Sequence, residues 1–262
     1  MKIIKIIPII FIIAIIASPA DTFSLKKKNA ILNKAINLYH GLKKSNIKWD
    51  VIGESNSNNK IYSKQFGLGK KLTLIIGGIH GDEPAGFISA LKLAQFIKKN
   101  PSSIQNSVII VPCINPDGLL RGTRVNGRGV DINRNFPGET WSSDFTKIYN
   151  NPGSHPASEP ETTALIRLIE EYKPNMIIQM HQPFNALYPS SDAPAKLMNM
   201  MSDLSELPVI DDDVGYPTPG SLGNYRRSKK IKIIGITFEL CDIDIEPEYH
   251  KIIAALIAAI NY

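Results

Sequence analysis

Short apolar runs alternate with helical patterns along most of the chain. The runs LTLIIGG, SVIIVPCI, NMIIQM and IKIIGITFEL each have the length and composition of a buried strand. Between and after them, apolar residues recur at helical spacing over residues 84–99, 159–172, 194–205 and 247–261. Near-continuous apolar strands that alternate with helices indicate an α/β fold. We therefore expect a single domain with a mainly buried, mixed sheet flanked by helices.

Two stretches depart from this alternation. Upstream of the first run, residues 27–45 have the pattern of an amphipathic helix, and residues 47–66, broken by Asn and Ser, that of a hairpin. Residues 115–157 carry Gly, Pro, Asn and Arg with little periodicity of either kind. A segment of that length without regular structure in a compact domain is usually functional or disordered, and the residues it contains favour function.

The first twenty residues have the layout of an export signal. Two lysines precede an almost unbroken run of Ile, Phe and Ala, and the small-residue sequence ASPA follows. This pattern predicts a signal peptide over residues 1–20 and a mature domain over residues 21–262. The alternative is an uncleaved membrane anchor, for which the apolar run is short and interrupted by Pro8. In both cases the rest of the chain is expected in the periplasm or cell envelope.

Charge and composition narrow the classes of function. The chain has 262 residues and a net charge of +6, which falls to +4 once the two lysines of the predicted signal are removed. This mild basic bias favours anionic surfaces, but no Lys/Arg cluster is interleaved with aromatic residues, so no nucleic-acid partner is expected. Cys113 and Cys241 lie at or near the ends of apolar runs. Export would permit a disulfide between them, but we expect two buried free thiols.

Chemically active side chains follow the apolar runs directly. His80 and Glu83 come after LTLIIGGI, His181 comes after NMIIQM, and Glu239 stands at the end of IKIIGITF. Ligands in open α/β sheets bind outside the carboxyl ends of the strands, so these side chains are expected at one site. Two histidines and a carboxylate form a catalytic zinc set that leaves one position to water. Gly81 is expected to let the backbone turn tightly between His80 and Glu83.

The long irregular segment adds groups that bind an anion. It contains RGTRVNGRGVDINRNFP, in which Asn133 and Arg134 stand together between Asp131 and Phe136. A guanidinium and amide groups in one small patch bind a carboxylate in fork geometry. A carboxylate-bearing substrate is therefore expected beside the zinc set.

Several other polar residues are given structural or surface roles. Ser158 and Glu161, in SEPET, have the spacing of a capping box at a helix start. His155 lies near them in sequence, whereas His40 and His250 are remote, and all three are interpreted as surface or core residues. The acidic run of residues 211–213 is interpreted as a solvated charge run.

Together these motifs resemble the zinc carboxypeptidase family. HGDE, NPDG, TRVNGRGVDINRNFP, SEPET, the strand-end His181 and TFEL occur in the family's order and setting, over roughly residues 70–262. GTRVNGRGVDINRNFP, GSHPASEPETTAL and VGYPTPGSLGNY are similar to its bacterial murein tripeptide amidase branch, which removes meso-diaminopimelate from γ-D-glutamyl peptides of the cell wall. The resemblance implies a zinc carboxypeptidase-like catalytic domain over residues 21–262, one Zn²⁺ per chain, and a metallopeptidase that acts on murein peptides. The first twenty residues, rather than the resemblance, predict that this enzyme is exported.

The resemblance also implies a role for each residue of the metal site. His80, Glu83 and His181 would be the zinc ligands, and Glu239 would be the general base. Asp131, in GVDINRN, would orient a zinc-bound imidazole by accepting a hydrogen bond from it.

The substrate-binding residues follow from the same resemblance. Asn133 and Arg134 would hold the free carboxylate of the departing residue. Arg124 would polarise the scissile carbonyl, with Arg121 of the same RGTR sequence as the alternative. The family's substrate-capping tyrosine would fall near Gly215, so Tyr216 is expected to bind substrate.

Other functions use parts of the same set. A general zinc carboxypeptidase that releases C-terminal L-residues would differ only in its pocket, so its partner would be any peptide with a free C-terminal carboxylate. An N-acyl amino acid deacylase shares HxxE and an Asn-Arg pair, but NPDG and TFEL weigh against it. A catalytically silent binding protein would hold zinc without turnover. A membrane contact is expected only through an uncleaved signal segment.

Overall fold

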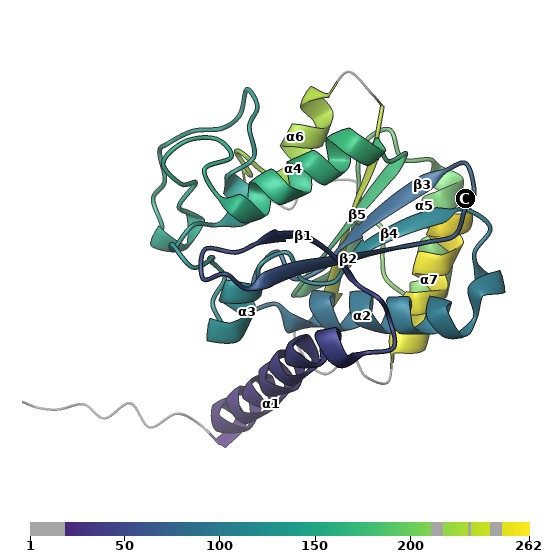
Figure 1. Cartoon of the computed structure of the whole chain (residues 1–262), viewed down its shortest axis with the longest axis horizontal. Helices are drawn as coiled ribbons and strands as arrows, with labels where there is room; N and C mark the ends of the chain where they lie inside the picture. The colour runs from purple at the N-terminus through teal and green to yellow at the C-terminus, as the bar shows by residue number, and fades with distance from the viewer. Residues whose placement is uncertain (1–18, 211–216, 230–231, 242–247) are drawn as a thin grey trace, which may run out of the picture.

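A seven-stranded mixed sheet forms the centre of the computed structural model, which describes residues 19–210, 217–229, 232–241 and 248–262 (Figure 1). The strand order is β1-β2-β4-β3-β5-β7-β6. The four central strands are parallel neighbours: β4 (Ser107–Val111), β3 (Leu72–Ile76), β5 (Met176–His181) and β7 (Ile234–Cys241). The hairpin of β1 (Asp50–Glu54) and β2 (Lys60–Phe66) and the strand β6 (Phe184–Pro189) extend the two edges in antiparallel pairing.

Helices cover both faces of this sheet. One face carries α2 (Pro84–Lys99), α5 (Ala195–Ser205) and α7 (Tyr249–Asn261), with α1 (Pro19–Gly41) packed outside α2 (Figure 1). The other face carries α4 (Pro160–Tyr172) and α6 (Leu222–Ser228). The short helix α3 (Pro116–Arg121) and the 3-10 turns η1 (Leu42–Lys44), η2 (Pro101–Ser103), η3 (Ile132–Arg134) and η4 (Ile148–Asn150) complete the structure.

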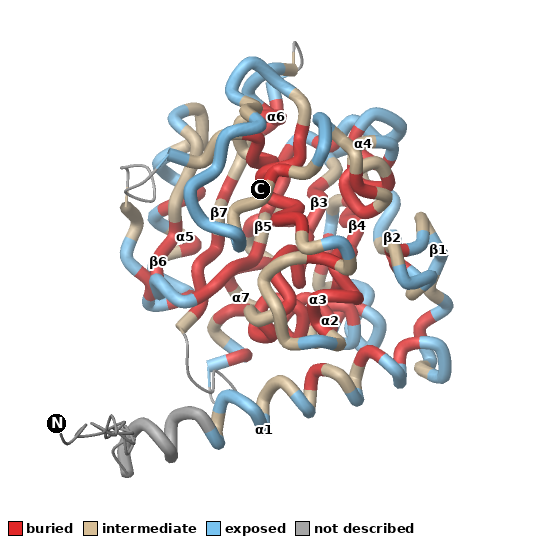
Figure 2. Tube along the Cα trace, turned by 90° about the vertical axis from the view of Figure 1, so that its left-hand side faces the viewer, coloured by how far each residue is buried: buried red, intermediate tan, exposed pale blue. Residues whose placement is uncertain are grey.

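The two cores follow from the two-residue period of the strands. Ile75 packs into the core under α2 and α7, whereas Leu74 and Ile76 on the same strand pack into the core under α4 and α6. Every residue of β4 is buried, and Figure 2 shows the middle of the sheet as the most buried part of the chain. Burial on both faces explains why the central strands are near-continuous apolar runs.

The strand order changes direction at β3: the next strand in sequence, β4, lies on one side of it, and β5 lies on the other. From β3 the chain crosses through α2 to β4 on one side, then returns through α4 to β5 on the other side of β3. Because the crossover helices lie on opposite faces, the loops beyond the carboxyl ends of β3 and β5 diverge and leave a crevice. The residues that follow these two strands are therefore placed to form a site.

The α/β fold predicted from the sequence is confirmed. The four predicted strands, the hairpin and the four later helices are all present, and the helix ends agree within two residues. The N-terminal helix begins at Pro19 rather than near residue 27, and α3, β6 and α6 were not predicted. Cys113 and Cys241 are free thiols as expected, although Cys241 is only partly buried.

The predicted signal segment lies almost wholly outside the described residues, so its cleavage after Ala20 stays a prediction. Within the described part of the chain, no helix combines the length and the apolar character that a membrane span needs.

Candidate metal centre and substrate pocket

The HGDE stretch joins the end of β3 to the start of α2. Pro84 is the first residue of α2, where its missing N–H removes no helical hydrogen bond, and Glu83 caps the helix immediately before it. His80 lies three residues upstream, in the loop beyond the carboxyl end of the strand. His181 is the last residue of β5 and is directly paired with Glu239 on β7. Three neighbouring strands, β3, β5 and β7, thus place these four side chains at the carboxyl end of the parallel part of the sheet.

Gly81 lies in the expected turn and is required there for an additional reason. Its backbone is not in the left-handed region, so the turn itself does not demand glycine. Instead, a Cβ added at Gly81 would lie 1.9 Å from the carbonyl carbon of Gly118 and 2.2 Å from the nitrogen of Leu119. The chain does turn here, since the N–H of Glu83 donates to the backbone oxygen of His80 at 3.3 Å, but it is the close approach of the α3 backbone that excludes a side chain.

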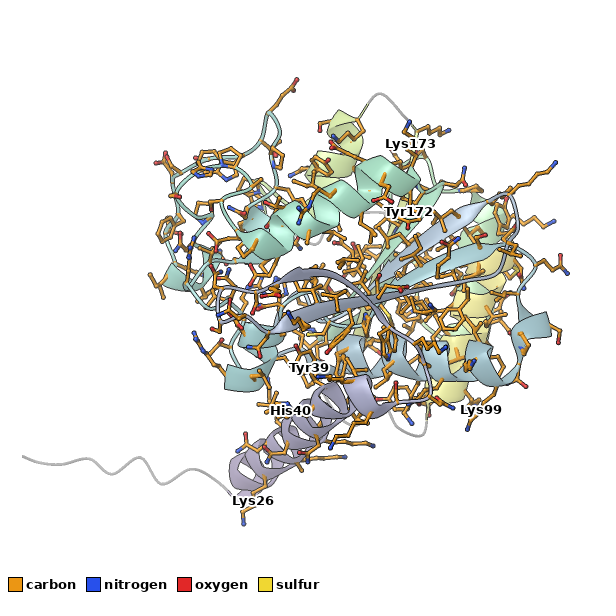
Figure 3. All side chains as sticks on the ribbon, viewed as in Figure 1. Lys26, Tyr39, His40, Lys99, Tyr172 and Lys173 are labelled. Atoms are coloured by element: carbon orange, nitrogen blue, oxygen red, sulfur yellow. The ribbon has the colours of Figure 1, made fainter. Side chains whose placement is uncertain are left out.

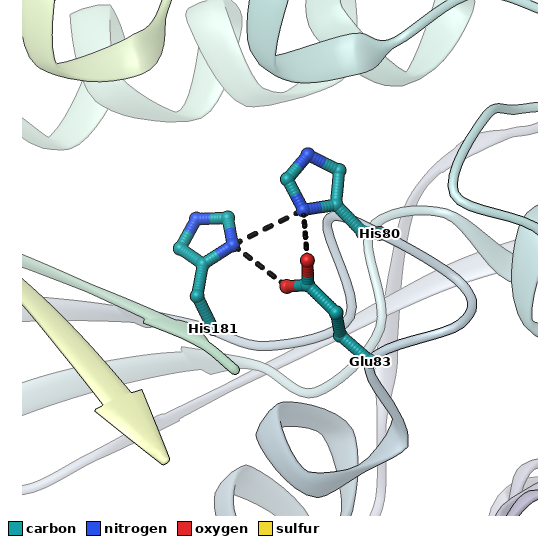
Figure 4. A group of neighbouring side chains, drawn as sticks. All are labelled: His80, Glu83 and His181. Carbon is teal, nitrogen blue, oxygen red and sulfur yellow. Dashed lines mark hydrogen bonds and ion pairs between the residues drawn. The ribbon is translucent and has the colours of Figure 1, made fainter. Parts of the chain in front are cut away.

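His80, Glu83 and His181 converge on one point (Figure 4). The Nδ1 atom of His80 lies 2.8 Å from Oε1 of Glu83, and Nδ1 of His181 lies 2.9 Å from Oε2 of the same carboxylate. The two Nδ1 atoms are 3.2 Å apart. Two imidazole nitrogens and a carboxylate are the ligand types of a catalytic zinc site, so this group fits a zinc ion.

Nearby carboxylates make this point favourable for positive charge. Both histidines and Glu239 are nearly inaccessible to solvent. Burial acts to lower the pKa of His80, but the carboxylates of Glu83 and Asp131 outweigh it and raise that pKa to about 9. These carboxylates make the space between the two histidines electrostatically favourable for a positive charge.

Asp131 and Arg124 form a second layer around His80. Asp131 is fully buried, and its Oδ1 lies 3.2 Å from Nε2 of His80. Its Oδ2 accepts from Nε of Arg124 at 3.0 Å. Another nitrogen of that guanidinium, Nη1, lies 3.3 Å from Oε1 of Glu83. Arg124 thus lies against the candidate metal ligands His80 and Glu83, and its guanidinium lines the same cavity.

Arg121 is placed elsewhere. It is exposed, and its Nη1 donates to the backbone oxygen of Gly127 at 3.0 Å. Because Arg124 lines the cavity and Arg121 does not, the position of the two side chains favours Arg124 as the group that faces a scissile carbonyl.

The two predicted anion-binding residues also face the cavity. Asn133 and Arg134 belong to η3, and both are buried. The carboxylate of Asp131 accepts the backbone N–H of Asn133 at 2.8 Å, and Oδ1 of Asn133 accepts from the nitrogen of Leu222 at 3.0 Å. Arg134 donates through Nη1 to the backbone oxygen of Asn133 at 2.7 Å. A guanidinium at such a position is fixed before any substrate arrives.

Glu239 completes the metal end of the cavity. Burial raises its pKa above the usual range, which suits a group that must take up a proton. The cavity has a volume of about 440 Å³ and is lined by both predicted ligand histidines, Glu83, Arg124, Asn133 and Arg134. Tyr216, the other predicted substrate residue, lies outside the described residues.

Two further lining residues had no recognisable sequence signal. Gln182 accepts the N–H of Ala85 on its Oε1 at 2.8 Å and so joins β5 to the start of α2. Arg226 lies on α6, at the far end of the cavity from the metal cluster. Its place in an ordinary basic stretch, YRRSKK, gave no indication of burial.

The capping-box interpretation of SEPET is wrong. The helix begins at Pro160 with Glu159 as its capping residue, one position later than Ser158 would need. The hydroxyl of Ser158 instead donates to Oε1 of Glu159 at 2.8 Å. Glu161 is fully buried and accepts from Nδ2 of Asn126 at 3.1 Å. Pro160 is the first residue of the helix, and Glu161 follows it in the first turn.

The remaining histidines take no part in the site. His40, His155 and His250 are exposed, and His40 lies on the N-terminal helix with its ring against Tyr39 (Figure 3). Of the histidines, only His80 and His181 belong to a candidate metal cluster among the described residues.

Comparison with known proteins agrees with this geometry. Residues 33–244 match the family described as zinc carboxypeptidase. The chain belongs to this family. It is 34% identical over 163 residues to murein peptide amidase A of Escherichia coli K12, a match that covers 58% of this chain and 64% of that protein. It is 32% identical over 200 residues to the protein of that name from Vibrio campbellii, covering 72% of this chain and 77% of the relative.

Two solved structures share the fold. The structure of murein-tripeptide amidase MpaA from Escherichia coli O157 has a TM-score of 0.70 and 26% identity, and covers 82% of this chain and 92% of that one. Bovine thrombin-activatable fibrinolysis inhibitor has a TM-score of 0.67 at 20% identity, over 89% of this chain and 95% of that one, and this likeness shows the fold alone.

Proposed function

We propose that the protein is an exported zinc hydrolase that cleaves the bond between γ-D-glutamate and meso-diaminopimelate in murein peptides. The observation that carries this proposal is a single cavity that contains the cluster of His80, Glu83 and His181, the buried Glu239, and the buried Arg134. The amidase relatives support the choice of a murein peptide as substrate.

The metal centre supplies the first part of the chemistry. Zinc held by His80, Glu83 and His181 would act as a Lewis acid and lower the pKa of a bound water to about 7. Glu239 accepts a proton from the attacking water and then donates it to the departing amine. Its buried carboxylate holds that proton more readily than an exposed glutamate would, since burial raises its pKa.

The remaining groups bind and orient the peptide. Arg124 faces the scissile carbonyl and stabilises the negative charge that develops on its oxygen. Asn133 and Arg134 hold the free carboxylate of the departing residue. An internal peptide bond offers no such carboxylate, so this arrangement selects the end of a chain.

Export is part of the proposal and is supported by the first twenty residues alone. An exported enzyme would trim peptides in the wall or periplasm. Localisation of the full chain with a C-terminal tag, compared with a chain in which the two lysines and the apolar run are deleted, tests this part. A cytoplasmic location of the full chain would refute it.

The activity is tested by incubating the zinc-loaded protein with L-Ala-γ-D-Glu-meso-diaminopimelate and, separately, with an ordinary L-peptide. Products are followed by mass spectrometry, with Glu239→Gln as the matched control. Release of diaminopimelate by the unaltered protein but not by the variant is the expected result. Release from the L-peptide alone would make the protein a general zinc carboxypeptidase. Bound zinc with no product from either would indicate a binding protein.

A further inference from the structure

The cavity extends from the metal cluster along two paired strands. Side chains two residues apart point to the same face of a strand, so one face of β5 and β7 forms its wall. Three levels of this wall line the cavity, and they consist of the pairs His181 and Glu239, Gln179 and Thr237, and Ile177 and Gly235. Nε2 of Gln179 donates to Oγ1 of Thr237 at 2.8 Å and closes the middle level.

Arg226 lies at the lowest level, buried against Gly235. Only 7% of Arg226 is exposed, and it lines the cavity. A Cβ added at Gly235 would lie 2.5 Å from Nε of Arg226, so the absence of a side chain there makes room for the guanidinium. Its Nη1 donates to the backbone oxygen of Ile233. The arginine is therefore held in a fixed position by the strand.

A carboxylate accompanies this guanidinium. Oδ1 of Asp192 lies 3.5 Å from Nη1 of Arg226 and accepts a hydrogen bond from the hydroxyl of Ser190. That hydroxyl in turn accepts the backbone N–H of Gly235 at 3.0 Å. Asp192 does not line the cavity itself, but it lies beside the lining residues Ser190 and Ser191, and its side chain is 25% exposed. The lower end of the cavity is thus lined by a guanidinium that has a carboxylate directly beside it.

This end of the cavity is distant from the reacting bond. Glu239 and Gly235 are four residues apart on β7, which corresponds to about 13 Å along the strand. A short side chain held at the metal end would leave the charge pair unreached. A long apolar side chain would displace water from Arg226 and Asp192 without offering them hydrogen bonds. Because removing charged groups from water in this way is unfavourable, the cavity disfavours such side chains as well. The occupant that fits is a long side chain with an ammonium and a carboxylate at its tip.

We propose that Arg226 and Asp192 determine specificity by binding the terminal amino-carboxylate group of the departing residue. Arg226 binds the carboxylate of that group and Asp192 binds its ammonium. Each charge of the ligand thus faces the opposite charge of the protein. This inference rests on the proposed function, since diaminopimelate is the residue whose side chain ends in both groups. It adds two residues to which the sequence assigned no role.

The test uses three tripeptides of the form L-Ala-γ-D-Glu-X, in which X is meso-diaminopimelate, L-lysine or L-2-aminopimelate. Lysine lacks only the distal carboxylate, and 2-aminopimelate lacks only the distal amine. Each omission should lower kcat/KM about ten- to a hundredfold in the unaltered protein, as loss of one hydrogen-bonded charge does. The affinity of the Glu239→Gln variant for the three peptides, measured by calorimetry, should follow the same order without turnover.

Two variants then assign the two groups. Arg226→Gln should lower kcat/KM for the diaminopimelate and 2-aminopimelate peptides and leave the lysine peptide almost unchanged. Asp192→Asn should lower it for the diaminopimelate and lysine peptides and leave the 2-aminopimelate peptide almost unchanged. A variant that merely perturbs packing would lower all three alike, and that result would overturn the inference.

Arg227, the next residue on α6, provides the comparison: it also borders the cavity, but it is exposed and donates to Oδ1 of Asn224. If Arg227→Gln removes the discrimination and Arg226→Gln does not, the assignment is wrong. The same X residues at the end of ordinary L-peptides separate the two proposals. If only the ordinary L-peptides are cleaved and the γ-D-glutamyl peptides are not, the γ-D-glutamyl specificity is refuted. The order of kcat/KM among the three X residues would still support or refute the roles of Arg226 and Asp192.

Discussion

Asp131 accepts the ring hydrogen of His80 when Nδ1 of that histidine faces the metal, because its Oδ1 lies 3.2 Å from Nε2. The same carboxylate accepts from Arg124 and from the backbone N–H of Asn133. One buried side chain therefore contacts the predicted metal ligand His80, the guanidinium of Arg124 and the backbone of Asn133. A substitution at Asp131 should therefore disturb all three contacts together.

Replacing Asp131 with Asn should lower zinc affinity about ten- to a hundredfold, because the imidazole of His80 loses its charged acceptor. Zinc competition against a chelating dye measures this directly. Asp117→Asn is the matched control, since Asp117 is equally buried but bonds to Ser55, Ser57 and Asn59. Equal zinc affinity in the two variants would show that Asp131 has only a structural role.

Replacing Arg124 with Ala should lower kcat about a hundred- to a thousandfold, the usual loss when one oxyanion donor is removed. Arg121→Ala, in the same RGTR sequence, removes an exposed guanidinium that bonds to Gly127 and should leave kcat unchanged. Steady-state kinetics on the same tripeptide compare the two variants. A larger loss from Arg121→Ala would transfer the carbonyl-facing role to that residue.

Replacing Arg134 with Ala should raise KM about ten- to a hundredfold while zinc stays bound, because a charged hydrogen bond to the substrate is lost. A substrate with an amidated C-terminus lacks the matching carboxylate. The KM of the unaltered protein for the amidated substrate should therefore be about as high as the KM of the variant for the free acid. Amidation should not raise the KM of the variant any further. An additional loss on the amide would contradict the assigned role.

The sequence was sufficient to predict the residues that follow the central strands. LTLIIGG and NMIIQM are buried on both faces of the sheet, so their composition alone indicated parallel strands, and the polar residues beyond them had to lie at one edge. The prediction of an α/β fold succeeded for this reason. The roles of His80, Glu83, His181 and Glu239 remain predictions, although the structure brings them together.

The rest depended on tertiary contacts that no local pattern carries. The strand β6 contains FNALYP, which is short and ends in proline, and it exists because β7 offers an edge for pairing. Arg226 is buried because Gly235, on another element, leaves space for it. The turn at Gly81 could be expected from the sequence, but the close approach of α3 that excludes a side chain there could not, because Gly118 is distant in sequence.

Replacing Gly81 with Ala should destabilise the protein by several kcal/mol, about the range of a severe packing mutation, because the backbone of Gly118 cannot move aside easily. Thermal unfolding of the zinc-free protein measures this without the contribution of the metal. Gly41→Ala adds the same methyl group where no atom lies within 4 Å, so it should have little effect. Similar unfolding temperatures for both variants would refute the close-approach explanation.

Glu161 should make stability depend on pH. It is fully buried, and among the described residues no hydrogen bond reaches its Oε1. Burial raises its pKa from the ordinary 4.5 to about 7, with Glu159 and Asp117 acting in the same direction against the donor Asn126. The folded protein therefore keeps a proton that the unfolded chain releases above pH 4.5. The contribution of Glu161 to the free energy of unfolding is therefore fully present below pH 4.5 and is lost as the pH rises through about 7.

Replacing Glu161 with Gln removes this titration and keeps the amide oxygen as an acceptor for Asn126. The unaltered protein should lose up to about 3 kcal/mol more than the variant between pH 5 and pH 8. Urea unfolding of both proteins across that range gives the difference. Glu171→Gln, at the exposed end of the same helix, is the control and should follow the unaltered protein. If Glu161→Gln also follows it, Glu161 does not titrate between pH 5 and pH 8.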